Sequence, residues 1–168
     1  MNCSKALICR RVTLDRMPGE QILQKSVTID APASAVWASL TTPSLIQQWM
    51  WDAPLDITSD WMPGSPLIIS GDLHGRPFTN KGTILACDPE HLLRYTQWST
   101  ITECTDEPGN YCVLAFHLEE ARGQTTVTLT QTNFVSETSF KHYEFYWNTT
   151  LFLMKRVIEE SAPSPDTM

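Results

Sequence analysis

The sequence predicts a single α+β domain in which a curved antiparallel β-sheet wraps around a long C-terminal helix. Three observations predict this fold class. Two proline-led helical segments follow a first strand, residues 56–134 have the pattern of short strands separated by turns, and the last folded segment has helical periodicity. With 168 residues, 42% of them hydrophobic, the chain has the size of one domain with a sizeable core.

The first part of the domain predicts one strand and two short helices. Residues 21–29 mix apolar and polar residues with β-branched types, as expected of a strand. Pro32 is expected at the first position of a helix, where its fixed φ is favourable and its missing N–H is not needed. Pro43 predicts a second helix in the same way, and the Thr42 hydroxyl is expected to cap the free amides of that helix.

The middle of the chain predicts an antiparallel meander with one face turned inward. Leu114, Phe116 and Leu118 alternate with other residues, while Val127 and Leu129 alternate with threonines. A period of two is the pattern of strands that are buried on one side only. Glycine-containing turns separate these segments, which favours hairpin connections between neighbouring strands.

The end of the chain predicts a long amphipathic helix. Its apolar residues recur at steps of three and four, with charged and polar residues on another face. These apolar residues are Phe140, Tyr143, Trp147, Leu151, Met154 and Ile158. The expected organisation is therefore a flexible leader over residues 1–20, the folded domain over residues 21–160 and a disordered tail over residues 161–168.

Composition argues against several classes of partner. The formal net charge of −7 and the sequence pI of about 5.0 would repel nucleic acids and acidic membrane surfaces. No apolar run approaches the roughly 18 residues of a membrane helix. The five cysteines are an odd number without a CxxC pair, which favours reduced thiols and a cytoplasmic location.

Motifs for common catalytic and cofactor chemistry are missing from the sequence. The four histidines have no paired spacing that would bind a metal, and there is no nucleophile elbow, phosphate-binding loop or dinucleotide fingerprint. We therefore expect no metal and no cofactor, and an enzyme is not favoured. Cys112 lacks an identifiable base and is interpreted as a small buried hydrophobic residue. His74 is interpreted as an exposed turn residue.

The large aromatic residues are the strongest candidates for a binding site. Tryptophan and tyrosine combine an apolar ring with a polar group, which suits the wall of a cavity, although the same rings could simply fill the core. On one strand, Arg94 and Gln97 must point to opposite faces, and Tyr95 shares the face of Gln97. The residues predicted to form a cavity wall are Trp49, Trp61, Tyr95, Trp98, Phe116, Leu129, Tyr143, Trp147 and Leu151.

Several segments together resemble a known superfamily. The stretch IDAPASAVW at residues 29–37, KGTI at residues 81–84 and the spacing of apolar residues after Trp147 resemble the START-like, or SRPBCC, helix-grip superfamily. Within it, they resemble the branch named after the activator of the ninety-kilodalton heat-shock protein ATPase, over roughly residues 22–160. The resemblance implies the helix-grip fold. Family members commonly have glycine before this tryptophan, so Tyr146 predicts a narrower cavity.

The resemblance leaves three functions open, because this fold hosts lipid carriers, cyclases, hydrolases and co-chaperones. The first is binding of a small hydrophobic, aromatic or lipid-like molecule in an internal cavity between sheet and helix. The second is a co-chaperone-like or protein-interaction module with an exposed apolar patch, which would give it a chaperone partner. The third is a cyclase or hydrolase, which needs polar groups with shifted pKa values inside the cavity. Either a monomer or a homodimer fits the sequence.

Overall fold

The computed structural model describes residues 21–162, and it contains one seven-stranded sheet and a long C-terminal helix. The predicted leader, and the tail beyond residue 162, lie outside the described residues. The strands are β1 (Leu23–Ile29), β2 (Asp56–Ser59), β3 (Pro66–Leu73), β4 (Arg76–Asp88), β5 (Leu92–Ser99), β6 (Cys112–Ala121) and β7 (Gln124–Thr132). The helices are α2 (Ala33–Thr41), α3 (Pro43–Met50) and α4 (Glu137–Ser161), with short 3₁₀ turns η1 (Thr100–Thr102) and η2 (Pro108–Asn110). The predicted α+β class is confirmed.

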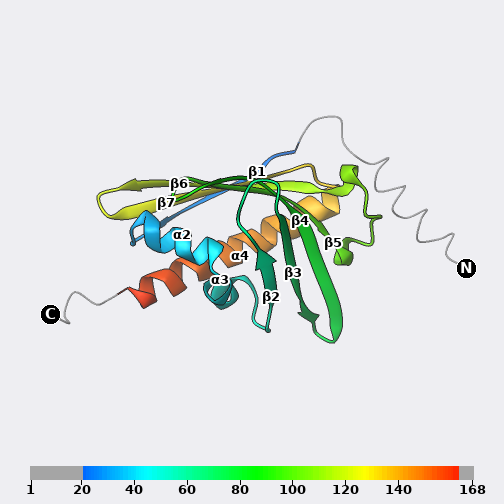
Figure 1. The fold of residues 1–168 in the computed structure, drawn as a ribbon, viewed down its shortest axis with the longest axis horizontal. Helices are drawn as coiled ribbons and strands as arrows, with labels where there is room; N and C mark the ends of the chain where they lie inside the picture. The colour runs from blue at the N-terminus through cyan, green and yellow to red at the C-terminus, as the bar shows by residue number, and fades with distance from the viewer. Residues whose placement is uncertain (1–20, 163–168) are drawn as a thin grey trace, which may run out of the picture.

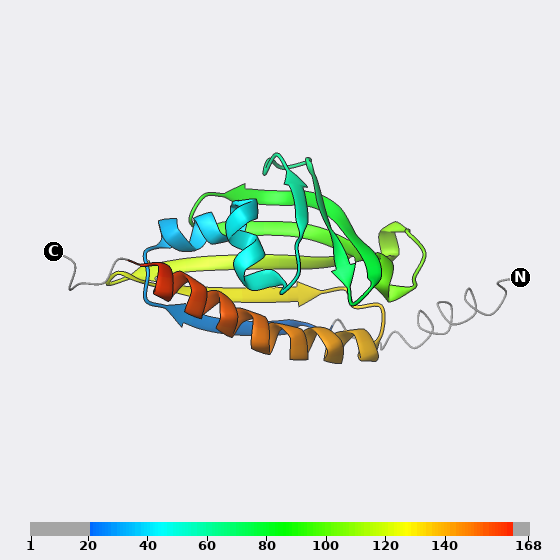
Figure 2. The same ribbon diagram turned by 90° about the horizontal axis from the view of Figure 1, so that it is seen from below.

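All neighbouring strands are antiparallel, in the order β1-β7-β6-β5-β4-β3-β2. The sheet bends, so that β2, β3 and β4 come down beside the helices (Figure 1). All three helices lie on the same face of the sheet, with α4 running along it and α2 and α3 beside α4 (Figures 1 and 2). This is the curved sheet gripping a helix that the sequence predicts.

The two short helices begin at or directly after a proline, as predicted, but the hydrogen bonds at their N-termini differ from the prediction. Pro32 is the N-cap residue of α2 rather than its first helical residue. The free amide of Ala33 donates to Glu120 Oε2 at 3.3 Å, so a side chain from β6 satisfies the start of α2. The predicted cap by the Thr42 hydroxyl is wrong, because this exposed side chain makes no cap bond and the α3 amides bond to the backbone carbonyl of Thr42.

The inner faces of β6 and β7 form the floor of the domain. Leu114, Phe116, Val127 and Leu129 are all at most 1% exposed, as the period of two predicts. The outer face of β7 is lined by threonines that pair with the outer face of β1, where Thr126 Oγ1 lies 3.1 Å from the Thr28 hydroxyl. The buried side of the sheet therefore faces the helices and the other side faces solvent.

Helix α4 is most deeply buried in its second half. Its fully buried residues begin at Trp147 and continue through Ile158, while the turns before Trp147 contain none. The start is fixed by Ser136, whose hydroxyl accepts from the amide of Ser139 at 3.0 Å. Near the end, Glu159 accepts from the amide of Asp30 at 2.8 Å. In the first half of α4, Tyr143 and Tyr146 are only partly buried against the core and border a cavity.

Candidate functional site

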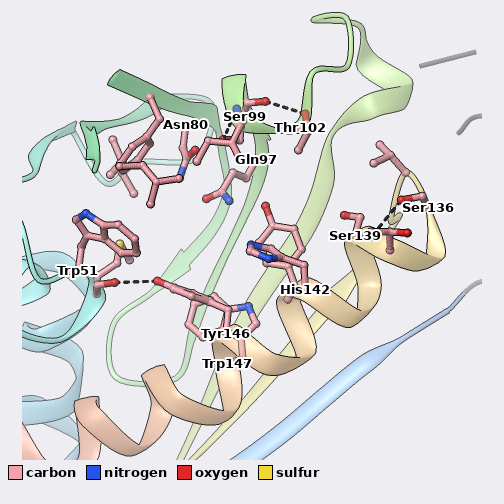
Figure 3. A pocket seen from close by; sticks show the side chains of 18 of the residues that line it. Trp51, Asn80, Gln97, Ser99, Thr102, Ser136, Ser139, His142, Tyr146 and Trp147 are labelled. Atoms are coloured by element: carbon pink, nitrogen blue, oxygen red, sulfur yellow. Dashed lines mark hydrogen bonds between the residues drawn. The ribbon is translucent and has the colours of Figure 1, made fainter. Parts of the chain in front are cut away.

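A cavity of about 790 Å³ lies between the concave face of the sheet and the first half of α4 (Figure 3). A volume of this size is typical of sites for small molecules. Apolar side chains in its lining include Met50, Trp51, Leu55, Ile69, Leu73 and Phe78. Polar side chains in its lining include Asn80, Gln97, Ser99, Thr102, Ser136 and Ser139.

The cavity reaches solvent between η1 and the first turns of α4. Ile101 on η1 lines the cavity and is 47% exposed. On α4, the lining residues Glu137, Thr138 and His142 are exposed as well. The lining residues on β4 and β5, in contrast, are buried or half-buried. A ligand would therefore enter at this end and meet the sheet last.

Two aromatic residues close the side of the cavity next to α3. The Trp51 indole N–H donates to the carbonyl of Asp72 at 3.2 Å, and the ring meets Phe78 edge-on at 6.2 Å between centroids. The Tyr146 hydroxyl donates to the carbonyl of Met50 at 3.0 Å and thereby ties α4 to the end of α3. The Tyr146 ring lines the cavity and fills space that would be empty if this position were glycine, as it commonly is in the family that the sequence resembles (Figure 3).

The floor of the cavity rests on a buried chain of hydrogen bonds. The Trp147 indole N–H donates to Gln131 Oε1 at 2.9 Å, and Gln131 Nε2 donates to Cys112 Sγ at 3.4 Å. The Cys112 thiol in turn donates to the carbonyl of Gln97 at 3.3 Å. Gln131 is fully buried, so this chain satisfies polar groups that water cannot reach. It also fixes the orientation of the Trp147 ring.

We expect Gln131→Leu to lower the free energy of unfolding by about 1–3 kcal/mol, because the Trp147 indole N–H is left buried without an acceptor. Chemical denaturation of the purified variant measures this change. Gln124→Leu, at an exposed position on the same strand, is the control and should stay within about 0.5 kcal/mol of the parent protein. A Gln131→Leu protein as stable as the control would show that the chain of hydrogen bonds does not stabilise the floor.

The thiol in this chain of hydrogen bonds belongs to Cys112, and it is buried, as the sequence analysis expects. Burial raises its pKa to about 11, despite opposing hydrogen bonds from Gln131 and the backbone. The thiolate fraction near pH 8 should therefore be on the order of 100-fold lower than in an unfolded chain. We expect iodoacetamide to leave Cys112 unmodified in the folded protein and to label it after denaturation, as read by peptide mass mapping. Equal labelling rates in both states would contradict this.

The tyrosines around the cavity keep their protons. Burial raises the pKa of Tyr146 to about 12, and burial also raises the pKa values of Tyr95 and Tyr143. The nearby Gln97 side chain acts in the opposite direction on the pKa of Tyr143, but burial outweighs it. Hydroxyls that hold their protons this firmly serve as hydrogen-bonding groups rather than as acids or bases near neutral pH. The arrangement can therefore bind and orient a molecule.

Three of the nine residues predicted for the cavity wall line this cavity, namely Tyr95, Tyr143 and Trp147. Three others lie in the packed core next to it. Phe116 is buried behind two residues that line the cavity: its ring is stacked with that of Tyr95 at 6.4 Å and edge-on to that of Trp147 at 5.7 Å, between centroids. Leu129 and Leu151 are buried in the same core cluster.

The remaining three predicted wall residues are tryptophans outside the lining. The Trp49 indole N–H donates to the carbonyl of Ser39 at 3.0 Å, so its ring packs α3 against α2. Trp61 lies in the loop between β2 and β3 with a positive φ of 55°. Trp98 points to the outer face of the sheet, where the Lys81 ammonium group lies 5.5 Å from its ring centroid.

The polar residues of the lining were not among the predicted site residues. Gln97 and Ser99 could have been found, because they share a strand face with Tyr95. Ser139 and Tyr146 could also have been found from their spacing on the helix around Tyr143. No local signal marks Asn80, which reaches the cavity only because β4 curves with the sheet.

The gripped helix and the cavity beneath it define a helix-grip protein of the START-like class. Within this class, the chain belongs to the family described as "Activator of Hsp90 ATPase homolog 1-like protein", whose match spans residues 30–159. The predicted superfamily is confirmed. The search of curated protein sequences found no match.

Solved structures agree with this assignment. A solution structure of a protein from Cytophaga hutchinsonii is 34% identical, with a TM-score of 0.73, and the match covers 86% of this chain and 97% of that one. A crystal structure of a Mesorhizobium loti protein is 19% identical, with a TM-score of 0.70 over 85% and 100% of the chains. The Aha1 dimer from Colwellia psychrerythraea, solved in solution, is 19% identical, with a TM-score of 0.67 over 85% and 99%.

Two further observations concern membranes and metals. No helix in residues 21–162 is both long enough and apolar enough to cross a membrane. Over the same residues, no three His, Cys, Asp or Glu side chains gather in a way that could hold a metal ion.

Proposed function

We propose that this protein binds a small, largely apolar molecule, aromatic or lipid-like, in the cavity between the sheet and α4. The observation that carries the proposal is a cavity of about 790 Å³ whose walls are mostly apolar and aromatic. Burial of an apolar ligand against such walls contributes roughly 25 cal/mol per Å² of apolar surface removed from water. We place this activity in the cytoplasm, because five cysteines without a CxxC pair favour thiols that stay reduced.

The construction of the cavity supports binding without large rearrangement. The Trp51 ring is held by the carbonyl of Asp72, and the Tyr146 ring by the carbonyl of Met50. Below them, the Trp147 ring is held by Gln131. Side chains that are already ordered lose little conformational entropy when a ligand arrives, so more of the contact energy appears as affinity.

Screening the purified protein against neutral aromatic and lipid-like compounds tests the proposal. A ligand at about 100 times its Kd stabilises the folded state by about 2.7 kcal/mol, which for a chain of this length raises Tm by roughly 5–10 °C. Native mass spectrometry should show one ligand per chain. A library in which no compound shifts Tm or adds mass would overturn the proposal.

A second candidate function is a protein-interaction module that uses the outer face of α4. Phe145 and Phe152 lie two helical turns apart on this face and are 76% and 55% exposed, which is unusual for phenylalanine. The family description, with its activation of a chaperone ATPase, supports a chaperone as the partner. Mixing the protein with the heat-shock ATPase tests this candidate, and the absence of both association and stimulation would eliminate it.

A further inference from the structure

Besides the polar residues at its open end, the cavity has a group of buried or half-buried polar side chains on the sheet side. Asn80 on β4 pairs in register with Ser99 on β5, and Gln97 follows two residues away on the same face. All three line the cavity, and Figure 3 shows Asn80 and Gln97 side by side on the strands, facing the helix. Trp51, by contrast, belongs to the apolar wall beside α3. The cavity therefore has apolar walls and a polar inner end on the sheet, away from its open mouth.

Asn80 carries an unmet hydrogen-bonding capacity at this polar end. Its Oδ1 is shielded from solvent and has no partner among the residues that the structure describes. A buried polar atom without a partner is costly, and it is rare in folded proteins. Because the amide oxygen and nitrogen exchange places when the group rotates, Asn80 can meet a donor or an acceptor on a ligand. Its position in the lining marks where a ligand's polar group would lie.

The lining supplies no partner for a charge deep in the cavity. Among the described residues, no Lys, Arg or Asp lines it. The one lining carboxylate, Glu137, is exposed at the mouth and pairs with Lys141 at 3.3 Å. The one lining histidine, His142, is also exposed at the mouth. An ionised group placed beside Asn80 would lose its hydration without gaining a counter-charge, which is strongly unfavourable.

We infer that the ligand is an uncharged amphipathic molecule with an apolar, ring-containing body and one hydroxyl, carbonyl or carboxamide group. The body lies against Trp51, Phe78 and Trp147, and the polar group meets Asn80 and Gln97. Fatty acids, phosphorylated lipids and amines are disfavoured in ionised form. The inference rests on the proposed function, because it names the class of molecule that the same cavity takes.

A series of probes that share one ring system tests the inference. Naphthalene has no polar group, naphthol and naphthamide carry neutral ones, naphthoate is an anion and naphthylmethylammonium is a cation. We expect naphthol and naphthamide to bind about 10-fold or more tighter than naphthalene, and both ions to bind at least about 10-fold more weakly than naphthamide. Isothermal titration at one pH and one salt concentration gives the five affinities.

The outcomes separate the inference from the proposed function. If the ions bind as tightly as naphthamide, or if all five probes bind equally, the inference fails while cavity binding stands. If no probe binds and the wider library also gives no ligand, the proposed function itself fails. The predicted order of affinities supports both.

Asn80→Leu tests the polar end directly, because it removes the amide at nearly constant size. We expect naphthamide affinity to fall about 10-fold, to the level of naphthalene, while naphthalene affinity is unchanged. In the unliganded protein, Tm should rise by about 2–4 °C, since the buried orphan atom is gone. Asn148→Leu, on the exposed face of α4, should change none of these values.

Asn80→Ser keeps a hydrogen-bonding group and provides the second variant. We expect it to retain part of the preference for naphthamide over naphthalene. A uniform loss of affinity for all probes in both Asn80 variants, with Tm lowered, would show that Asn80 acts only in packing and would overturn the inference.

Discussion

Gly82→Ala is expected to lower the free energy of unfolding by about 4 kcal/mol or more. This is the largest loss of stability among our predictions, although the substitution adds only one methyl group. A Cβ at Gly82 would lie 2.5 Å from the carbonyl carbon of Thr96 and closer still to its oxygen. These are backbone atoms of the neighbouring strand, so no side-chain rotation relieves the overlap. Because small domains are stable by only about 5–15 kcal/mol, much of the protein should be unfolded on mild heating.

The cause is a close approach of β4 and β5 at this point. The amide of Thr83 donates to the Thr96 hydroxyl at 2.9 Å instead of joining the regular ladder. Gly109→Ala is the matched control, because a Cβ there meets nothing within 4 Å. Denaturant unfolding followed by circular dichroism should separate the two variants. Equal stabilities would mean that β4 and β5 do not approach as closely as described.

Ser139→Trp is expected to abolish ligand binding while leaving the fold intact. Ser139 is half-buried, lines the cavity from α4 and lies near its open end, so a large ring at this position fills the entrance. Its role at the start of α4 is carried by its backbone amide, which every residue except proline retains. Loss of roughly 100-fold or more in affinity would follow from steric exclusion of the ligand.

Thr149→Trp is the control for this experiment. Thr149 is on the same helix but exposed, so the same ring is added outside the cavity. Its affinity for a cavity ligand should equal that of the parent protein, as measured by titration of both variants. If Ser139→Trp binds the ligand as well as Thr149→Trp does, then the ligand does not occupy this cavity.

Most of the fold can be predicted from local patterns in the sequence. Alternation around Phe116 and Leu129 reports a sheet with one buried face, and the repeat from Tyr143 to Ile158 reports a helix with one buried stripe. Pro43 marks the start of α3 because its geometry suits few other positions. The cap of α2 is different. Glu120 reaches it from a strand far along the chain, so no local pattern could reveal it.

The site is less visible in the sequence, because a cavity is defined by where packing stops. Helical spacing places Tyr143 and Trp147 on one stripe, but it does not show that these two residues border a cavity while the stripe beyond them is fully packed. Large rings are also used for packing, as Trp49 and Phe116 are here. Asn80 shows the limit most clearly, since its importance lies in a missing hydrogen bond that only the folded chain creates.

Amide proton–nitrogen correlation spectra of the labelled protein, titrated with naphthamide, test the central claim most directly. The account predicts that the largest shifts occur at the side-chain amides of Asn80 and Gln97 and at the indole groups of Trp51 and Trp147. Shifts concentrated instead around Phe145 and Phe152 on the outer face of α4, or no shifts at saturating probe, would contradict it.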